Sequence, residues 1–234
     1  MTVATRAWPS ADEVHVWQAA LDVGQSELRD LHRCLSREER ERADRCRGER
    51  LRVRHIAARG WLRHLLGAYV GGHPEDVVFV HGEHGKPRLA GVIGESLSFN
   101  VSHSEDTAVY AIAGGREVGI DVEKIRGDVP FDVVRRYFSR AEQDALAALP
   151  PGQQLRGFFE AWTRKEAYVK ATGIGLSGLL NPPGEARWLL HSVDVGPGYS
   201  AAVAVAGSAA VPRAAAWLRM ATGSGAVTRL ESRV

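Results

Sequence analysis

The spacing of apolar residues predicts strands and helices in an order that occurs twice along the chain. In the first half, a short alternating segment over 14–17 precedes a proline-free stretch over 36–70, where apolar side chains recur at helical spacing. Ser36 followed by Glu39 forms a capping-box pattern, so we expect one helix that begins there and ends before Gly71. Three runs typical of strands follow, over 77–80, 97–101 and 107–113.

The second half repeats this order. Strands are predicted over 118–123, 186–193, 199–206 and 214–220. Helices are predicted near 131–137, 140–149 and 154–172. The pattern therefore favours an α+β fold of two similar lobes, a pseudo-dimer in which each lobe is a small, mainly antiparallel sheet packed on a long helix. The lobes would comprise residues 1–115 and 116–234.

Composition excludes several classes of protein. The 234 residues are 44% hydrophobic and 25% charged, and a chain of this size can bury a core without a disulfide or a structural metal. Two cysteines, Cys34 and Cys46, are too few for a disulfide framework or a zinc site. Residues 1–12 lack the apolar segment of a signal peptide, and the Ala/Val-rich run over 201–206 is too short to span a bilayer. We therefore expect a soluble, cytoplasmic protein.

Arginine dominates the positive charge of the chain. Of the 30 basic residues, 26 are Arg, and the four lysines are Lys86, Lys124, Lys165 and Lys170. Twelve arginines and only six acidic residues fall between Arg29 and His64. Two interpretations stay open: a solvated helix face of Glu/Arg pairs, or a phosphate-binding surface, since guanidinium groups match phosphate oxygens. The phosphate could belong to nucleic acid or to a small polyphosphate, although few aromatic residues interleave with the arginines and the net charge is only +2.

A predicted strand carries two carboxylates on one face. Asp121 and Glu123 alternate with apolar residues, so their side chains lie about 7 Å apart on the same side. A divalent cation would relieve their repulsion, and oxygen ligands suit Mg²⁺. The alternative is a strand that faces solvent and carries two incidental acids.

The predicted helix over 154–172 carries charged residues beside its apolar face. Lys165 falls within the apolar arc, and Glu166 and Lys170, four residues apart, stack along its edge. A lysine in an apolar arc needs a partner or a ligand, because an unpaired buried ammonium is costly. A Glu–Lys pair with Lys165 reaching out to solvent explains the pattern equally well.

Four motifs in this order resemble the 4'-phosphopantetheinyl transferases, specifically the pseudo-dimeric surfactin-synthetase-activating (Sfp) type. They are G-K-P at 85–87, F-N-V-S-H-S at 99–104, V-G-I-D-V-E at 118–123 and W-T-R-K-E-A-Y-V-K at 162–170. The resemblance implies two similar lobes with the active site between them. It also implies an enzyme, a holo-[acyl-carrier-protein] synthase, that moves the phosphopantetheine arm of coenzyme A to a serine of an apo acyl or peptidyl carrier protein and releases adenosine 3',5'-bisphosphate.

The resemblance also implies a metal and a cellular role. Mg²⁺, or alternatively Mn²⁺, would be the cofactor. The carriers would belong to polyketide, nonribosomal peptide or fatty-acid synthesis. The enzyme would act as a cytoplasmic monomer, with neither nucleic acid nor a membrane as a partner.

Roles for individual residues follow from the motif match. The metal ligands would be Asp121, Glu123 and Glu166. The contacts to coenzyme A would come from Lys86, Pro87, Ser102, His103, Lys165, Lys170, Arg42, Arg54 and His55. The catalytic residues would be Glu166, Lys170, Glu142 and His103. Whether Glu142, Glu166 or a water takes the proton of the carrier serine stays open.

The lysines gain meaning from this match. Three of the four fall at proposed coenzyme contacts, whereas Lys124 is a surface neighbour of the acidic strand. A compact ammonium is not interchangeable with a planar guanidinium, so we expect Lys170→Arg to impair turnover.

Two other functions are compatible with parts of the sequence. Asp121-Val122-Glu123-Lys124 contains the E-x-K ending of a metal-dependent nuclease pattern, and the arginine-rich segment could follow a nucleic-acid backbone. That interpretation leaves the other motifs unexplained. A carrier-binding or nucleic-acid-binding module without catalysis is the third possibility, and the intact Asp121, Glu123, Glu166 and Lys170 argue against it.

Overall fold

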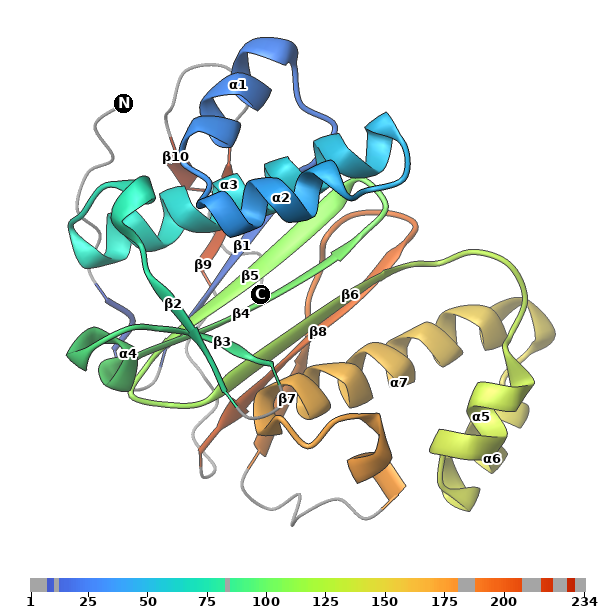
Figure 1. Ribbon diagram of the computed structural model, residues 1–234. Helices are drawn as coiled ribbons and strands as arrows, with labels where there is room; N and C mark the ends of the chain where they lie inside the picture. The colour runs from blue at the N-terminus through green and yellow to red at the C-terminus, as the bar shows by residue number, and fades with distance from the viewer. Residues whose placement is uncertain are drawn as a thin grey trace.

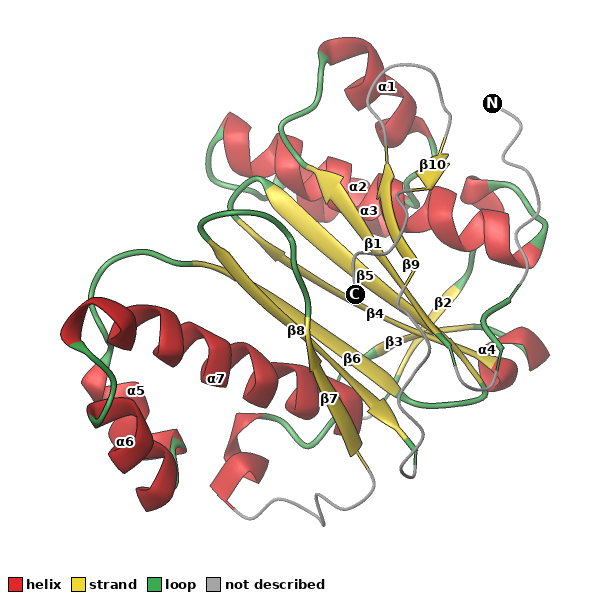
Figure 2. Cartoon of the chain, turned by 180° about the vertical axis from the view of Figure 1, so that it is seen from behind, coloured by secondary structure: helices red, strands yellow, loops and turns green. Residues whose placement is uncertain are grey.

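A computed structural model of the chain describes residues 8–10, 13–82, 85–180, 188–207, 216–220 and 227–229. Two lobes are evident, each with three antiparallel strands packed on one long helix, and two further strands extend the sheet of the first lobe (Figures 1 and 2). The α+β class and the pairing of each sheet with a long helix are therefore confirmed. No helix within these described ranges is long and apolar enough to cross a membrane.

The first lobe is built around three antiparallel strands in the order β1-β5-β4. Its strands are β1 (Val14–Ala20), β4 (Leu97–Ser104) and β5 (Thr107–Gly114). Its main helices are α1 (Gln25–Arg33), α2 (Arg37–Asp44) and α3 (Glu49–Val70). The shorter elements are η1 (Pro74–Asp76), β2 (Phe79–His81), β3 (Pro87–Leu89) and α4 (Val92–Ser96). Helix α3 covers one face of the sheet, where Leu62, Leu66 and Tyr110 are buried in the largest apolar core.

The second lobe repeats this plan with strands in the order β6-β8-β7. Its strands are β6 (Val118–Lys124), β7 (Trp188–Ser192) and β8 (Tyr199–Ala206). Its helices are α5 (Phe131–Tyr137), α6 (Arg140–Ala147), α7 (Pro151–Thr172) and η2 (Leu176–Leu180). Alanines of α7 and β8 pack together with no exposure, so the long helix lies close against its sheet.

The faces of the two sheets that lie away from α3 and α7 share one apolar core. Val16, Val109, Ile120 and Val203, from β1, β5, β6 and β8, are among its buried side chains. Burial of this surface holds the lobes together. At the edge of this core, β4 of the first lobe runs beside β6 of the second.

Side chains replace a backbone ladder where β4 meets β6. Alternate β4 residues accept hydrogen bonds from alternate backbone N–H groups of β6. The three pairs are Asn100 Oδ1 with Ile120 N (2.9 Å), Ser102 Oγ with Val122 N (3.4 Å) and Ser104 Oγ with Lys124 N (3.1 Å). This polar seam fixes the register of the two lobes, because each acceptor meets its donor at only one alignment of the strands.

The helix predicted over 36–70 is interrupted. The capping box at Ser36 and Glu39 forms as expected, but α2 ends at Asp44 and α3 begins at Glu49. Gly48 between them has φ 102°, a backbone conformation that residues with a side chain rarely adopt. Glycine at this position therefore allows the chain to turn before α3 starts.

The last predicted strand belongs to the sheet of the first lobe and not to that of the second. Strand β9 (Ala216–Met220) pairs in parallel with β1 of the first lobe, and β10 (Val227–Arg229) pairs with β9. We expected residues 216–220 to belong to the second lobe. Strand β8 has β6 and β7 on its two edges, whereas the second edge of β1 is free to take a partner. Residues 186–187 and 214–215 of the expected strands lie outside the described residues.

Candidate active site

Strand β6 and helix α7 bring the acidic residues together at a glycine. A Cβ atom at Gly119 would lie 2.1 Å from Ala167 O and 2.3 Å from Ala171 N, so only glycine allows the strand to lie this close to the helix. Successive side chains of β6 point to opposite faces of the sheet, so Asp121 and Glu123 lie on the same face as Gly119. This close approach places them opposite α7, which carries Glu166 and Lys170.

Asp121 is the most deeply buried acid of the site, with a relative exposure of 2%. Its Oδ1 accepts hydrogen bonds from Lys170 Nζ at 2.6 Å and from Ser102 Oγ at 2.8 Å. Its Oδ2 is buried with no hydrogen-bond partner within the described part of the chain. Burial raises the pKa of Asp121, against the opposing effects of Lys170 and Ser102. Half of this carboxylate is therefore open to a cation.

Glu123 and Glu166 share the electrostatic environment of Asp121. Burial raises the pKa of both carboxyl groups, and the negative charge of Asp121 raises it further. Ser104 Oγ donates a hydrogen bond to Glu123 Oε2 at 2.9 Å. In the described residues, no three His, Cys, Asp or Glu side chains converge closely enough to form a metal site. The predicted ligands are thus neighbours that repel one another, rather than a closed coordination set.

The serines of the seam also orient these carboxylates. Each serine accepts a hydrogen bond from a backbone N–H of β6. Ser102 also donates a hydrogen bond to the carboxylate of Asp121, and Ser104 donates one to that of Glu123. The motif match gave Ser102 as a phosphate contact and gave no role to Ser104. The signal for Ser104 was its spacing of two residues from Ser102, which places both hydroxyls on one side of β4.

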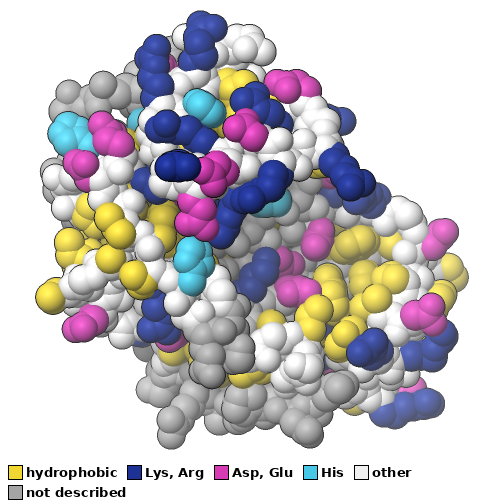
Figure 3. All heavy atoms as spheres, viewed as in Figure 1, with side chains coloured by type: hydrophobic (Ala, Val, Ile, Leu, Met, Phe, Trp, Pro, Cys, Tyr) yellow, Lys and Arg dark blue, Asp and Glu magenta, His cyan; other side chains and the backbone are white. Residues whose placement is uncertain are grey.

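A cavity of about 430 Å³ opens beside Asp121 and extends toward α2 and α3. The cations and donors that line it include Arg42, His55, Arg59, Ser102, His103 and Lys170. On the face of the molecule in Figure 3, Lys and Arg side chains gather over the helices of the first lobe, and a hollow lies between them and α7. Six of the nine predicted coenzyme contacts are thus brought to one cavity, since Pro87 lines it as well.

Two of the three histidines that line the cavity, His55 and His103, favour the neutral form. Desolvation lowers the pKa of His55, and the charge of Arg59 lowers it further. Desolvation and the charge of Lys170 act in the same way on His103. His55 Nε2 is buried with no hydrogen-bond partner in the described residues. An anion would satisfy this atom and favour protonation of the imidazole.

Arg59 lines the cavity and was not predicted. It lies four residues after His55, on the same face of α3. That spacing could have predicted that both side chains line the same cavity. Its Nε lies 3.3 Å from Oε1 of Glu39, which is 4% exposed and also accepts a 2.5 Å hydrogen bond from Arg63. Glu39 therefore holds one arginine in the core and another at the cavity wall.

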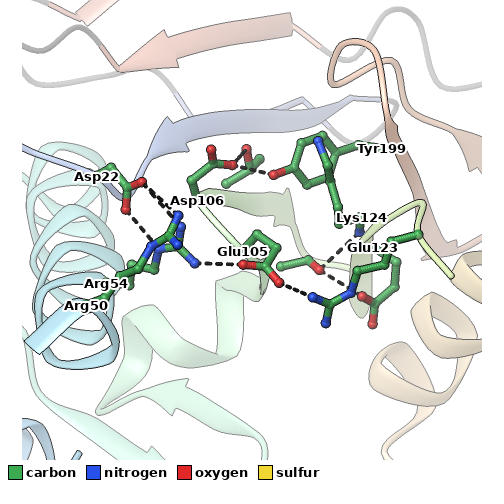
Figure 4. A network of polar contacts seen from close by, with 11 residues as sticks. Asp22, Arg50, Arg54, Glu105, Asp106, Glu123, Lys124 and Tyr199 are labelled. Atoms are coloured by element: carbon green, nitrogen blue, oxygen red, sulfur yellow. Dashed lines mark hydrogen bonds and ion pairs between the residues drawn. The ribbon is translucent and has the colours of Figure 1, made fainter. Parts of the chain in front are cut away.

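Arg54 lies away from the cavity. Its guanidinium donates to Asp22 at 2.9 Å and to Glu105 at 3.0 Å, and Glu105 in turn pairs with Arg126 (Figure 4). Arg54 is 8% exposed and fully engaged in this network. It connects α3 to the turn between β4 and β5, so the structure does not support a contact with the coenzyme.

Lys86 also turns away from the cavity. Its Nζ donates to Glu117 Oε2 at 2.6 Å, Val118 O at 3.1 Å and Ala171 O at 3.0 Å. Its neighbours Gly85 and Pro87 line the cavity. In the G-K-P motif, the residues before and after Lys86 therefore line the cavity, while the Lys86 ammonium is hydrogen-bonded to protein groups.

Glu142 and Lys165 form an ion pair with each other. Their Oε1 and Nζ atoms lie 2.8 Å apart, and the Lys165 ammonium also lies over the Phe138 ring, 5.2 Å from its centroid. Burial alone would raise the pKa of Glu142, but hydrogen bonds from Lys165 and Ser139 hold it below its ordinary value. Neither residue lines the cavity described above.

Lys124 does not complete a nuclease site. Its Nζ lies 4.3 Å from the centroid of the Tyr199 ring, where a cation–π contact forms (Figure 4). The E-x-K lysine is thus directed toward Tyr199, which weakens the nuclease interpretation.

Comparisons with known proteins agree with the four motifs. Residues 17–114 match the family described as 4'-phosphopantetheinyl transferase, N-terminal, and residues 117–197 match the 4'-phosphopantetheinyl transferase superfamily. The 4'-phosphopantetheinyl transferase HetI of Nostoc sp. is 40% identical over 211 residues, covering 84% of this chain and 89% of the relative. A 4'-phosphopantetheinyl transferase of Bacillus subtilis is 32% identical over 143 residues, covering 61% and 62% of the two chains. The chain therefore belongs to the Sfp-type 4'-phosphopantetheinyl transferases, which transfer the phosphopantetheine arm to carrier proteins.

Proposed function

We propose that coenzyme A is the donor of the arm and that its phosphates bind in the cationic cavity. The observation that carries this proposal is the placement of a cation-lined cavity directly beside three carboxylates. Coenzyme A has two phosphate centres, a pyrophosphate and a 3'-phosphate. Ser102, His103 and Lys170 lie at the end near Asp121, which suits the pyrophosphate. Arg42, His55 and Arg59 line the cavity from α2 and α3, which suits the 3'-phosphate.

The carboxylates would hold the metal. Carboxylate oxygens suit Mg²⁺, and Asp121 Oδ2 is an unpaired buried acceptor. Glu123 and Glu166, whose pKa values burial and Asp121 raise, would complete the set by moving toward Asp121. When bound, the metal would neutralise charge on the pyrophosphate oxygens. Mn²⁺ would serve in its place.

The reaction is a displacement at phosphorus. The hydroxyl oxygen of the carrier serine forms a bond to the β-phosphorus, and the bond from that phosphorus to the bridging oxygen breaks. Adenosine 3',5'-bisphosphate leaves with the electron pair of that bond. Lys170 and His103 lie where they can donate to phosphate oxygens as their charge shifts, so their contribution is electrostatic and positional.

The proton of the serine needs an acceptor. Glu142 is a poor candidate, because its carboxylate is engaged by Lys165 at 2.8 Å and by the backbone N–H of Ser139 at 2.7 Å. We therefore favour Glu166, or a water beside it, as the acceptor. The carriers would be acyl or peptidyl carrier domains of polyketide, nonribosomal peptide or fatty-acid synthesis.

Intact-protein mass measurement tests this proposal. Purified enzyme, coenzyme A and Mg²⁺ are incubated with a panel of apo carrier domains from the three kinds of synthase. We expect a gain of one phosphopantetheine arm on the carrier serine and none on a carrier with Ala in its place. A panel that gains no mass would contradict the proposed donor, metal and carriers together. Replacement of Mg²⁺ by Mn²⁺ or a chelator then separates the metal from the donor.

A further inference from the structure

The side chain of Lys86 crosses from the first lobe to the second. It lies between Gly85 and Pro87, which line the cavity, and it is 13% exposed. An ammonium has three N–H donors, and three protein acceptors occupy them: the Glu117 carboxylate and the carbonyls of Val118 and Ala171. No donor is left for a phosphate unless one of these contacts breaks.

Two of the three acceptors lie on the two elements that carry the acidic site, and Glu117 directly precedes one of them, β6. Val118 begins β6, three residues before Asp121. Ala171 follows Lys170 in the last turn of α7. One lysine of the first lobe thus contacts both the strand and the helix that position the carboxylates.

The chemistry of these acceptors suits a permanent ammonium. The carbonyl of Ala171 belongs to the C-terminal turn of α7, where carbonyls lack helical partners and the helix dipole favours a cation. Glu117 also accepts from Arg88 at 2.6 Å, so two cations of one hairpin hold the same carboxylate. Burial lowers the pKa of Lys86, and Glu117 opposes that effect.

We propose that Lys86 is a positioning residue that fastens β6 and α7 to the first lobe, and that it is not a ligand of the coenzyme phosphates. The cavity belongs largely to the first lobe and the carboxylates to the second, so their relative position depends on contacts that bridge the lobes. The polar seam of β4 and β6 supplies one set of such contacts, and Lys86 supplies another at Val118, the first residue of β6. Lysine fits this place because a planar guanidinium cannot direct three donors at acceptors on three sides.

A comparison of Lys86→Met, Glu117→Gln and the double variant tests the proposal. Only the kcat measurement of this test rests on the proposed function, in which coenzyme A is the donor. Two further measurements, coenzyme A affinity by calorimetry without a carrier and thermal unfolding, do not need transfer. If wild-type enzyme fails to bind coenzyme A, the proposed donor is wrong, and the unfolding data still report on the contact between Lys86 and Glu117.

The expected result has three parts. Both single variants lower kcat by about tenfold or more, which corresponds to roughly 1.4 kcal/mol. Their dissociation constants for coenzyme A stay within about twofold of wild type, because no ligand contact is lost. The double variant has the same kcat and unfolding temperature as Lys86→Met, because both substitutions remove the same contact between Lys86 and Glu117. Lys86→Arg does not restore kcat.

Other results would overturn the proposal. A rise of tenfold or more in the dissociation constant of Lys86→Met, with Glu117→Gln unchanged, would make Lys86 a phosphate ligand. A lower unfolding temperature with wild-type kcat in both variants would reduce the contact to a purely stabilising one. Arg88→Met is the matched control, since its partly exposed ion pair with the same Glu117 is worth little. If Lys86→Met does not fold, Glu117→Gln carries the same comparisons.

Discussion

Lys170 Nζ lies 2.6 Å from Asp121 Oδ1, while the second oxygen of Asp121 is buried without a hydrogen-bond partner among the described residues. The same ammonium lies 2.9 Å from Ser102 Oγ. One oxygen of Asp121 is therefore held by the protein, and the other would be available to the proposed metal ion. The lysine stands at the boundary between the carboxylates and the cavity.

Lys170→Arg should lower turnover although it keeps the charge. A guanidinium is larger and planar, so it cannot occupy the space between Asp121 Oδ1 and Ser102 Oγ without moving one of them. We expect kcat to fall by about tenfold or more, roughly 1.4 kcal/mol in the barrier. Steady-state transfer assays measure this, with circular dichroism to show an intact fold. A wild-type rate would contradict the role given to the ammonium.

Arg59→Gln should weaken recognition of the 3'-phosphate. We expect kcat/KM for coenzyme A to fall by about tenfold or more, as for loss of a charged hydrogen bond, and that for dephospho-coenzyme A to change little. The preference for coenzyme A would thus shrink. Arg45→Gln is the control, because Arg45, at the end of α2, is exposed and does not line the cavity. Equal losses with both substrates would show that Arg59 does not contact that phosphate.

Binding of adenosine 3',5'-bisphosphate should take up a proton at His55. Desolvation and Arg59 lower the pKa of His55 in the free protein, and a bound phosphate would raise it. Between these two pKa values the complex holds more protons, so affinity increases as the pH falls through that interval. Calorimetry at neutral pH in buffers of different ionisation enthalpy measures the uptake. Uptake that is the same in wild type and His55→Asn would assign the proton to another group.

Asn100→Ala should destabilise the joint between the lobes. Asn100 is 6% exposed and accepts the Ile120 N–H at 2.9 Å, so its loss leaves a buried donor unsatisfied. We expect the free energy of unfolding to fall by about 1–3 kcal/mol. Denaturant unfolding measures this. Ser98→Ala, two residues earlier on β4 and less buried, should change it by less than about 0.5 kcal/mol. Equal effects would show that the seam does not bear on stability.

Local patterns predicted much of the fold. The capping box at Ser36 forms as expected, and α5 and β8 have the predicted bounds. The break at Gly48 escaped prediction because an isolated glycine is tolerated within a helical pattern. The pairing of β9 with β1 escaped because period-two alternation identifies a strand without naming its partner.

The candidate site was predicted unevenly for a related reason. Asp121, Glu123, Glu166 and Lys170 could be grouped because two lie on one strand and two on one helix, and the structure brings these elements together at Gly119. The partners of an arginine or a lysine depend on residues distant in sequence. Arg54 forms ion pairs with Asp22 and Glu105, and Lys86 forms one with Glu117. The motifs alone could not predict these pairs.

We propose that the carboxylates beside the cavity hold the metal that transfer requires. Mass measurement of an apo carrier after incubation with coenzyme A and increasing Mg²⁺, for wild type and Asp121→Ala, tests it most directly. Calorimetry without metal first checks that the variant still binds coenzyme A. We expect wild type to load the carrier only when Mg²⁺ is present, and Asp121→Ala to load it at no Mg²⁺ concentration. Loading by Asp121→Ala at the wild-type rate, or by wild type in excess chelator, would contradict a role for these carboxylates in holding the metal.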